Sequence, residues 1–497
     1  MLKGLSATFS RDFTASIVVF LVAMPLCMGI AIASGVPPEK GLITGIIGGI
    51  VVGALAGSPL QVSGPAAGLA VIVFEIVREQ GLSALGPILM LAGIIQILAG
   101  LARVGGWFRA ISPAVVHGML AGIGVLIVVG QFHVLFDDKP LSSGLSNLLA
   151  MPGQLLGLSN QDAATAFAVG LVTIGAMLGW EKFRPASMKL VPAALVGVVL
   201  ATLVAFILGL PVARVAVPES IVAAVALPDQ GVLATMMNPT VITTAIAIAF
   251  IASAETLLSA AAVDRMHNGV RTNYNKELWA QGVGNFLCGG AGALPMTGVI
   301  VRSSANVQAG AKTRLSAILH GMWILAFVAV LPWLLREIPM AALAGILVVT
   351  GFRLVSVDHV RHLLHRYGPL PALVWAATLI MVVATDLLTG VLVGIGLSLI
   401  ELVPHARGLR LKVEETDAGD KHEVALQGTA TFLNLPGLSG RLESVPASRP
   451  VILNVERLNH IDHTCAEMVR EWIDRRRKAG SQVELLGATG RMTQLAA

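Results

Sequence analysis

Two short segments, Gln61-Val62-Ser63-Gly64-Pro65-Ala66-Ala67-Gly68 and Gly292-Ala293-Leu294-Pro295-Met296-Thr297-Gly298, interrupt long apolar runs with glycine and proline. A short apolar run that favours a helix follows each of them. A helix that begins inside a membrane leaves its first N–H groups without acceptors and directs the positive end of its dipole into a low-dielectric interior. Two such starts facing each other favour an anion site, and paired broken segments indicate the binding site of a secondary transporter.

The composition is that of an integral membrane protein. Of the 497 residues, 55% are hydrophobic and 13% are charged, and the apolar runs are long enough to span a bilayer. The third and tenth runs are too short to cross alone, so we expect each to reach its helix through an extended stretch. We predict about fourteen all-α membrane segments, with approximate ranges 13–34, 40–57, 65–78, 84–103, 113–135, 163–180, 189–209, 239–263, 276–291, 297–309, 312–334, 339–355, 369–386 and 387–404.

The order of the segments predicts an inverted repeat of seven plus seven, because a broken segment is the third of each half. Charge then predicts the orientation. In the membrane part, the predicted outer loops hold only Lys40, Arg78, Lys139, Arg214 and Arg336, whereas the inner loops are rich in Lys and Arg. We therefore expect a multi-pass protein of the cell inner membrane with cytoplasmic N- and C-termini. The net charge of +5 follows from this topology and indicates no nucleic-acid partner.

The composition changes near residue 405, which predicts a transmembrane domain over 1–405 and a small cytoplasmic α/β domain over 406–497. Strands are expected at 422–426, 450–455 and 482–486, with an amphipathic helix over 463–479 between the last two. This order is a βαβ unit. Asp462 or Thr464 is placed to cap the helix, whose inward face is Ala466, Val469, Trp472 and Ile473.

Three ionisable residues of the membrane segments are candidates for function. Glu255 shares a helix face with Ser259, one turn later, and a carboxylate in the hydrocarbon region normally faces a cavity or a partner. It is either a coupling or substrate site or one half of a structural ion pair. Arg302 adds a positive charge to the tenth segment, where it either attracts an anion or neutralises Glu255. Glu39 either caps a helix start or couples a proton.

The remaining polar groups suggest no metal, cofactor or enzyme chemistry. Asp264 and Asp386 stand at the ends of spans and are expected at the interface, and His359, His362 and His365 are expected on a solvated face. The cysteines have no metal-ligand spacing and are interpreted as packing residues. No nucleophile–base pair is evident, so an enzyme is not predicted.

Several motifs resemble the sulfate permease (SulP) family, whose animal members are the solute carrier 26 anion transporters. They are Ser253-Ala254-Glu255-Thr256-Leu257-Leu258-Ser259-Ala260, Asn275-Lys276-Glu277-Leu278-Trp279-Ala280-Gln281-Gly282-Val283-Gly284-Asn285, Leu294-Pro295-Met296-Thr297-Gly298, Arg302-Ser303-Ser304-Ala305-Asn306 and Gly310-Ala311-Lys312-Thr313-Arg314-Leu315-Ser316. The tail, with Val451-Ile452-Leu453-Asn454-Val455 and Ile461-Asp462-His463-Thr464, resembles a STAS domain. The resemblance spans nearly the whole chain.

The resemblance implies core and gate domains that move like an elevator, and a homodimer in the lipid membrane. It places the substrate, a small inorganic or carboxylate anion, between the third and tenth segments. The resemblance places an acidic residue at Glu255, and with Ser259 and Glu39 from the analysis above it gives the candidate coupling residues, with H⁺ or Na⁺ as coupling ion and no cofactor. The implied substrate-binding residues are Ala66, Ala67, Gly68, Thr297, Gly298, Val299, Ile300 and Arg302, together with Leu26 and Ile30 of the first segment.

At Leu26 and Ile30 the chain departs from the family pattern, which has a polar and an aromatic residue there. These departures weaken any prediction taken from sulfate transporters alone. Glu255 in the eighth segment favours cation symport, so the expected function is symport of sulfate, bicarbonate or a dicarboxylate. Two alternatives stay open. One is an uncoupled anion exchanger or channel. The other is a nucleobase carrier of the same architecture, although such carriers use carboxylates where this chain has Arg302.

Overall fold

A computed structural model describes residues 2–110, 112–141, 143–216, 221, 223–228, 231–267, 269–402, 410–418, 421–446, 450–478 and 480–487. The described chain forms two compact units. The first comprises Met1–Gly105, Leu120–Val355 and Met381–Leu388, and the second Gly106–Met119, Ser356–Ile380 and Thr389–Ala497. The domain boundary predicted near residue 405 lies within 403–409, outside the described residues.

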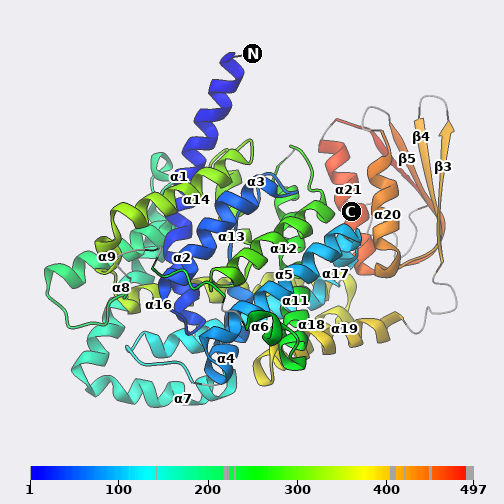
Figure 1. Cartoon of the computed structure of the whole chain (residues 1–497). Helices are drawn as coiled ribbons and strands as arrows, with labels where there is room; N and C mark the ends of the chain where they lie inside the picture. The colour runs from blue at the N-terminus through cyan, green and yellow to red at the C-terminus, as the bar shows by residue number, and fades with distance from the viewer. Residues whose placement is uncertain are drawn as a thin grey trace. The chain divides into compact units, whose positions relative to one another are not determined.

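Helices occupy every range that the sequence predicts as a membrane segment (Figure 1). Six of the described helical stretches are long and apolar enough to cross a membrane. They are Thr8–Ala33, Pro38–Leu55, Leu82–Leu101, Pro113–Val134, Gln161–Phe183 and Pro239–Met266. The helices are α1 (Leu2–Ala33), α2 (Pro38–Ile47), α4 (Ala70–Gln80), α5 (Leu85–Leu101), α6 (Pro113–Val134), α8 (Gln161–Phe183), α9 (Ala193–Ile207), α11 (Pro239–Met266), α12 (Tyr274–Gly290), α13 (Ile300–Gln308), α14 (Leu315–Val330), α16 (Met340–Leu354), α18 (Pro369–Ala384) and α19 (Leu387–Leu402).

Close helix contacts in the first unit depend on glycine. In the contact between α5 and α12, a Cβ at Gly282 would lie 2.6 Å from the Ile97 nitrogen and 2.7 Å from the Gly93 oxygen. Gly49, in the π-helical turn η1 (Gly48–Val52) that continues α2, meets the Gly321 backbone of α14 in the same way. Small residues at such contacts let helix backbones approach in the absence of a strong hydrophobic force.

Several helices were not predicted, and each lacks the length or the pattern of a span. The helix α7 (Gly144–Leu156) has 13 residues and contains Pro152, and α17 (Val357–Tyr367) is charged. Short helices also form at α10 (Val232–Met236) and α15 (Pro332–Leu335). The predictions over α7, α10 and α17 were loops, because a proline or a run of charges ordinarily argues against a membrane helix, whereas most of α15 falls within the predicted segment 312–334.

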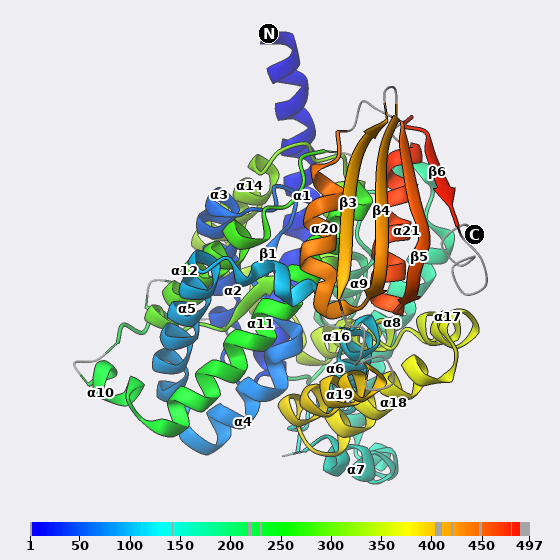
Figure 2. The same cartoon turned by 90° about the vertical axis from the view of Figure 1, so that its right-hand side faces the viewer.

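The C-terminal sheet confirms the predicted βαβ unit. Its strands β3 (Leu411–Ala418), β4 (Lys421–Ala430), β5 (Val451–Ile461) and β6 (Val483–Leu486) lie in that order, and Figure 2 shows them side by side. The pair β3–β4 is antiparallel, and β4–β5 and β5–β6 are parallel, with α21 (His463–Lys478) as the crossover between the last two. Strand β3 and helix α20 (Leu435–Ser444) were missed, since charged residues alternate along the strand and Pro436-Gly437 obscures the helix start.

Both α20 and α21 cover one face of this sheet (Figure 1), where they bury a core of their own. The four residues predicted to face inward from α21 are all buried, including Trp472, whose indole nitrogen donates to the Leu442 oxygen at 2.9 Å. Arg476, in the last turn of α21, stacks over Trp472, 5.0 Å from the ring centroid, and donates to the carbonyl oxygens of Val445 and Pro446.

The predicted cap of α21 is Asp462, which is buried. Its carboxylate accepts hydrogen bonds from the backbone nitrogens of Cys465, at 2.8 Å, and Phe432, at 2.5 Å. Desolvation raises the pKa of Asp462 to about 6, although these hydrogen bonds act in the opposite direction. The Asp462 carboxylate therefore links the start of α21 to the residues that follow β4. Its burial disfavours the ionised form.

We predict that this group makes the C-terminal unit less stable as pH rises. The folded state holds a proton on Asp462 up to pH of about 6, whereas an unfolded Asp loses it near its ordinary value of 3.8. The free energy of unfolding of a fragment 410–497 should therefore fall between about pH 4 and pH 6, by about 3 kcal/mol at most. Urea titrations at several pH values measure it. Asp462→Asn should flatten this slope, and Glu484→Gln, which removes an exposed carboxylate paired with Lys421, should not.

Candidate functional site

The two broken segments meet as a short antiparallel strand pair. Strand β1 (Ser63–Pro65) pairs with β2 (Met296–Gly298) in the register Ser63↔Gly298, Gly64↔Thr297 and Pro65↔Met296. Two more backbone bonds extend the pairing, from the Ala66 nitrogen to the Pro295 oxygen at 3.1 Å and from the Val299 nitrogen to the Val62 oxygen at 2.9 Å. The predicted extended stretches are thus confirmed, and each supplies hydrogen-bond partners to the backbone of the other.

Each strand leads into a helix start without a side-chain cap. After β2, the N-cap residue of α13 is Val299, and the Ser303 nitrogen makes the first bond of the helix, to the Val299 oxygen. The backbone N–H groups of Ile300, Val301 and Arg302 precede that bond and have no acceptor within the helix. After β1, the 3₁₀ turn η2 (Ala67–Leu69) also lacks a side-chain cap before α4 begins. Both starts present the positive end of a helix dipole, and the start of α13 also presents unshared donors.

Not all of the predicted backbone donors are free. The nitrogens of Ala66 and Val299 are used in the strand pairing, and the Gly298 nitrogen donates to Thr256 Oγ1 at 3.1 Å. Of the predicted residues, Ala66, Gly68, Thr297 and Gly298 are buried, whereas Ala67, Val299 and Ile300 are partly exposed. The donors available to a ligand are therefore those of the first helical turn and not those of the strands.

Glu255 of α11 lies against the start of the first broken helix. The Gly68 nitrogen donates to its carboxylate, and a Cβ at Gly68 would lie 2.8 Å from Oε2 and 3.0 Å from Oε1. Oε2 is buried and has no hydrogen-bond partner. Ser259, one turn further along α11, is also buried. The carboxylate thus occupies the positive end of a helix dipole.

Arg302 is completely buried, and among the described residues none of its three guanidinium nitrogens meets a partner at hydrogen-bond geometry. The guanidinium packs on Gly64 so closely that a Cβ there would overlap Nη1. The Cys27 thiol and the His320 ring are its polar neighbours. Among the described residues no ion pair joins Arg302 to Glu255, so the structure gives no support to the alternative that one neutralises the other.

The remaining predicted residues, Leu26, Ile30 and Glu39, lie on α1 and α2. Leu26 and Ile30 are buried on α1, which contacts β1 and α13. Glu39 lies in the first turn of α2, where its Oε2 is buried without a partner, and within the described chain no hydrogen bond or ion pair links it to Glu255 or Arg302. The structure therefore brings Glu255 and the two helix starts together and leaves Glu39 apart from them.

Sequence reasoning missed the polar side chains that hold the strand pair. Thr256 accepts from Gly298, and its carbonyl oxygen accepts from Gln61 Nε2 at 3.1 Å. Asn285 of α12 holds Met296 through two bonds, accepting from its nitrogen at 2.8 Å and donating to its oxygen at 3.1 Å. Asn285 also donates to Gln96 of α5 at 2.7 Å. Buried amides within apolar runs were the available signal, because such groups are retained where they have hydrogen-bond partners.

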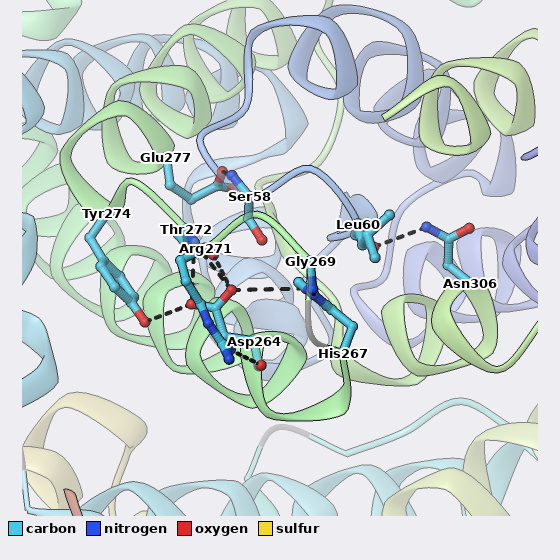
Figure 3. Close-up of polar contacts among 10 residues, drawn as sticks. All are labelled: Ser58, Leu60, Asp264, His267, Gly269, Arg271, Thr272, Tyr274, Glu277 and Asn306. Atoms are coloured by element: carbon cyan, nitrogen blue, oxygen red, sulfur yellow. Dashed lines mark hydrogen bonds and ion pairs between the residues drawn. The ribbon is translucent and has the colours of Figure 1, made fainter. Parts of the chain in front are cut away.

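A second polar cluster holds the segments at one end of α11 (Figure 3). Asp264, expected at the interface, is buried there and accepts from Thr272 Oγ1 at 2.9 Å and from the Tyr274 hydroxyl at 3.2 Å. Glu277, fully buried, accepts from the Ser58 nitrogen at 2.8 Å, just before β1. The cluster therefore fixes the loop after α11 to the chain that enters the first broken segment.

No metal centre is found among the residues that the structure describes. Of the predicted histidine face on α17, His365 is exposed, while the side chains of His359 and His362 lie outside the described part.

A family model and two curated relatives each match most of this chain. Residues 9–378 match the model of the sulfate permease family. YvdB of Bacillus subtilis (strain 168), a candidate sulfate transporter by its name, is 29% identical, with 98% of this chain and 93% of that protein covered. The bicarbonate transporter BicA of Picosynechococcus sp. is 24% identical, with 91% of this chain and 80% of BicA covered.

Two solved structures share the fold. The transmembrane domain of a cyanobacterial bicarbonate transporter BicA has a TM-score of 0.66 at 24% identity and covers 77% of this chain and 97% of its own. The structure of SLC26A9 has a TM-score of 0.70 at 14% identity and covers 99% of this chain and 86% of its own.

The packing of Gln61 on Gly298 yields a double-mutant prediction. A Cβ at Gly298 would overlap the Gln61 side-chain amide, so Gly298→Ala must expel Gln61 from its bond to Thr256. We expect Gly298→Ala to cost about 1–3 kcal/mol of stability. Because Gln61→Ala vacates the space, the double variant should be no less stable than Gln61→Ala alone.

Thermal unfolding of the purified protein in detergent measures these differences. Gly175→Ala is the matched control, since a Cβ on that exposed face of α8 meets no atom within 4 Å. Additive losses in the double variant would contradict the contact.

Proposed function

The chain belongs to the sulfate permease family, whose relatives include sulfate and bicarbonate transporters, and we propose that it is a secondary active transporter of sulfate, bicarbonate or a dicarboxylate. It is a polytopic membrane protein of an anion-transporting family. The observation that carries the finer proposal is the pair of uncapped helix starts with Glu255 at one and Arg302 in the other.

In the proposed site, the free N–H groups of α13 bind the oxygens of the anion. Helix starts bind oxyanions in this way because donors and dipole act together. The buried guanidinium of Arg302, with no carboxylate in an ion pair, supplies a net positive charge to the same region. A preformed, unshared cation lowers the free energy of an anion brought into a low-dielectric site.

Whether the site attracts an anion depends on the charge of Glu255. An ionised carboxylate about 4 Å from the anion would oppose it by about 4 kcal/mol at an effective dielectric of about 20, or roughly a thousandfold in affinity. Binding of H⁺ or Na⁺ at Glu255 removes that repulsion, and the unpartnered Oε2 and the nearby Ser259 are the groups that would receive the cation. The anion and the cation would then bind together, which is the condition for symport.

The surrounding architecture belongs to the same proposal. Fourteen segments would form an inverted seven-plus-seven repeat, divided into core and gate domains that move by an elevator-like mechanism. The C-terminal sheet with its two helices would be a cytoplasmic STAS domain, and the protein a homodimer in the inner membrane with both termini cytoplasmic. Two broken helices that meet at one site support this arrangement, because such sites sit at the interface of transporter repeats.

We predict that Glu255→Gln removes the cation dependence of uptake. The assay follows labelled sulfate, bicarbonate and dicarboxylates entering proteoliposomes, with and without inward H⁺ and Na⁺ gradients. Wild type should accumulate one anion only with a cation gradient, whereas Glu255→Gln, permanently neutral, should equilibrate it without coupling. Glu75→Gln, on the broken helix itself, is the matched control and should stay coupled.

If anions equilibrate independently of cations in both wild type and Glu255→Gln, the protein is an exchanger or channel and the coupling proposal fails. Uptake of an uncharged nucleobase in place of anions would favour the carrier alternative.

Arg302→Met should separate stability from function. Burying an unpaired charge destabilises the folded state, because the charge loses its hydration. Replacing it with methionine removes this cost, so the free energy of unfolding is expected to rise by about 1–4 kcal/mol. The same change should raise the KM for the anion about tenfold or more. Thermal unfolding and proteoliposome uptake measure the two effects. Arg214→Met, at an ion pair with Glu337, is the control and should change neither strongly. A loss of stability in Arg302→Met would instead indicate a structural role.

A further inference from the structure

A cavity of about 600 Å³ lies away from the two helix starts, between the beginnings of α5 and α11, the short helix α10 and the end of α12. Among the described residues that line it, Lys40 alone is charged, and it is 6% exposed. Polar groups of Gln80, Ser83 and Thr235 also line it. A buried cation in a membrane protein is costly, so its presence at a cavity points to a ligand.

The ammonium group of Lys40 is only partly satisfied by the protein. Its Nζ donates to the Ala224 oxygen at 2.8 Å, which leaves two of its three donors for other acceptors. The neighbouring Glu39 has a buried Oε2 that has no partner, and no ion pair joins the two in the described chain. Gly292 forms part of the wall, and a Cβ there would stand 3.5 Å from Nζ. Lys40 therefore brings to the cavity a positive charge that Glu39 attracts but that no carboxylate of the described residues meets in an ion pair.

The rim of the same cavity is apolar and exposed. Leu82 and Leu227 line it and are exposed, and beside Val232 and Thr235 of α10, Leu233 and Met237 are exposed as well. Lys40 belongs to the side that the charge distribution predicts to be outer, so this rim stands where outer-leaflet lipid meets the protein. A cation at depth with an apolar rim complements an anionic head group joined to acyl chains.

We propose that this cavity binds an anionic phospholipid of the outer leaflet, with Lys40 at the phosphate and the exposed leucines against the acyl chains. The lipid would bridge α2, α5 and α10 and would secure the segment at 223–228, which Lys40 and a bond from the Ala226 nitrogen to the Ala291 oxygen at 3.1 Å already hold. This site is independent of the proposed transport site, because none of its groups is Glu255, Arg302 or a donor of α13.

The test adds phosphatidylglycerol or phosphatidylcholine to the purified full-length protein in detergent. Retained lipid is counted by native mass spectrometry, and the midpoint of thermal unfolding is recorded at each lipid concentration. Wild type and Lys40→Arg should retain phosphatidylglycerol and show a saturable rise in midpoint, with little effect of phosphatidylcholine. Lys40→Gln should lose both effects.

A second variant tests the site in case Lys40→Gln fails to fold. Thr235→Trp fills the cavity and leaves Lys40 unchanged, so it should abolish lipid retention while the midpoint without lipid stays near that of wild type. Inorganic phosphate and glycerol 3-phosphate form the third arm. A saturable shift with these anions equal to that with lipid would overturn the lipid assignment in favour of a free anion. Unchanged retention of phosphatidylglycerol in both Lys40→Gln and Thr235→Trp would overturn the site itself.

Discussion

The antiparallel pairing of β1 with β2 is the interaction on which the rest of the site depends. Two helices interrupted within an apolar protein leave backbone N–H and C=O groups that neither lipid nor a neighbouring apolar side chain can satisfy. Each interruption here supplies the acceptors and donors of the other, from the pair Ser63↔Gly298 outward to the bonds of Ala66 and Val299. The pairing fixes both helix starts at the same place, so their free donors converge.

Buried amides and hydroxyls then hold this pair from outside. Thr256 holds Gly298, Asn285 holds Met296, and Gln96 links Asn285 to Ser253 of α11, at 3.1 Å. Because α5, α11 and α12 all contribute, a change in the packing of these helices would reach the helix starts through polar contacts that tolerate little displacement. The region is thus built as a rigid support for a small number of unsatisfied groups.

Two of the unsatisfied groups are those with a proposed function. Glu255 Oε2 and the three guanidinium nitrogens of Arg302 are buried without hydrogen-bond partners in the described chain, as are Gln61 Oε1 and Thr297 Oγ1 in the two broken segments. A protein gains stability by satisfying or removing such groups, so their retention is a cost to stability that binding of anion and cation would relieve. Lys40, with one acceptor at its cavity, is a milder case of the same kind.

Much of this protein could be derived from its sequence, because hydrophobic length and glycine–proline breaks act locally. The apolar runs predicted a helix in every membrane segment, though not α7, α10 or α17. The breaks at Gly64-Pro65 and Pro295 predicted the extended stretches, and the mixed sequence of the tail predicted β5, α21 and β6. What only the tertiary structure decided is which donors stay free and which charges stay unpaired. The backbone bonds of Ala66 and Val299 and the contact of Arg302 with Gly64 join residues more than two hundred positions apart. The burial of Asp264 depends on how the loop after α11 folds back on it. Local patterns carry no information on either kind of contact.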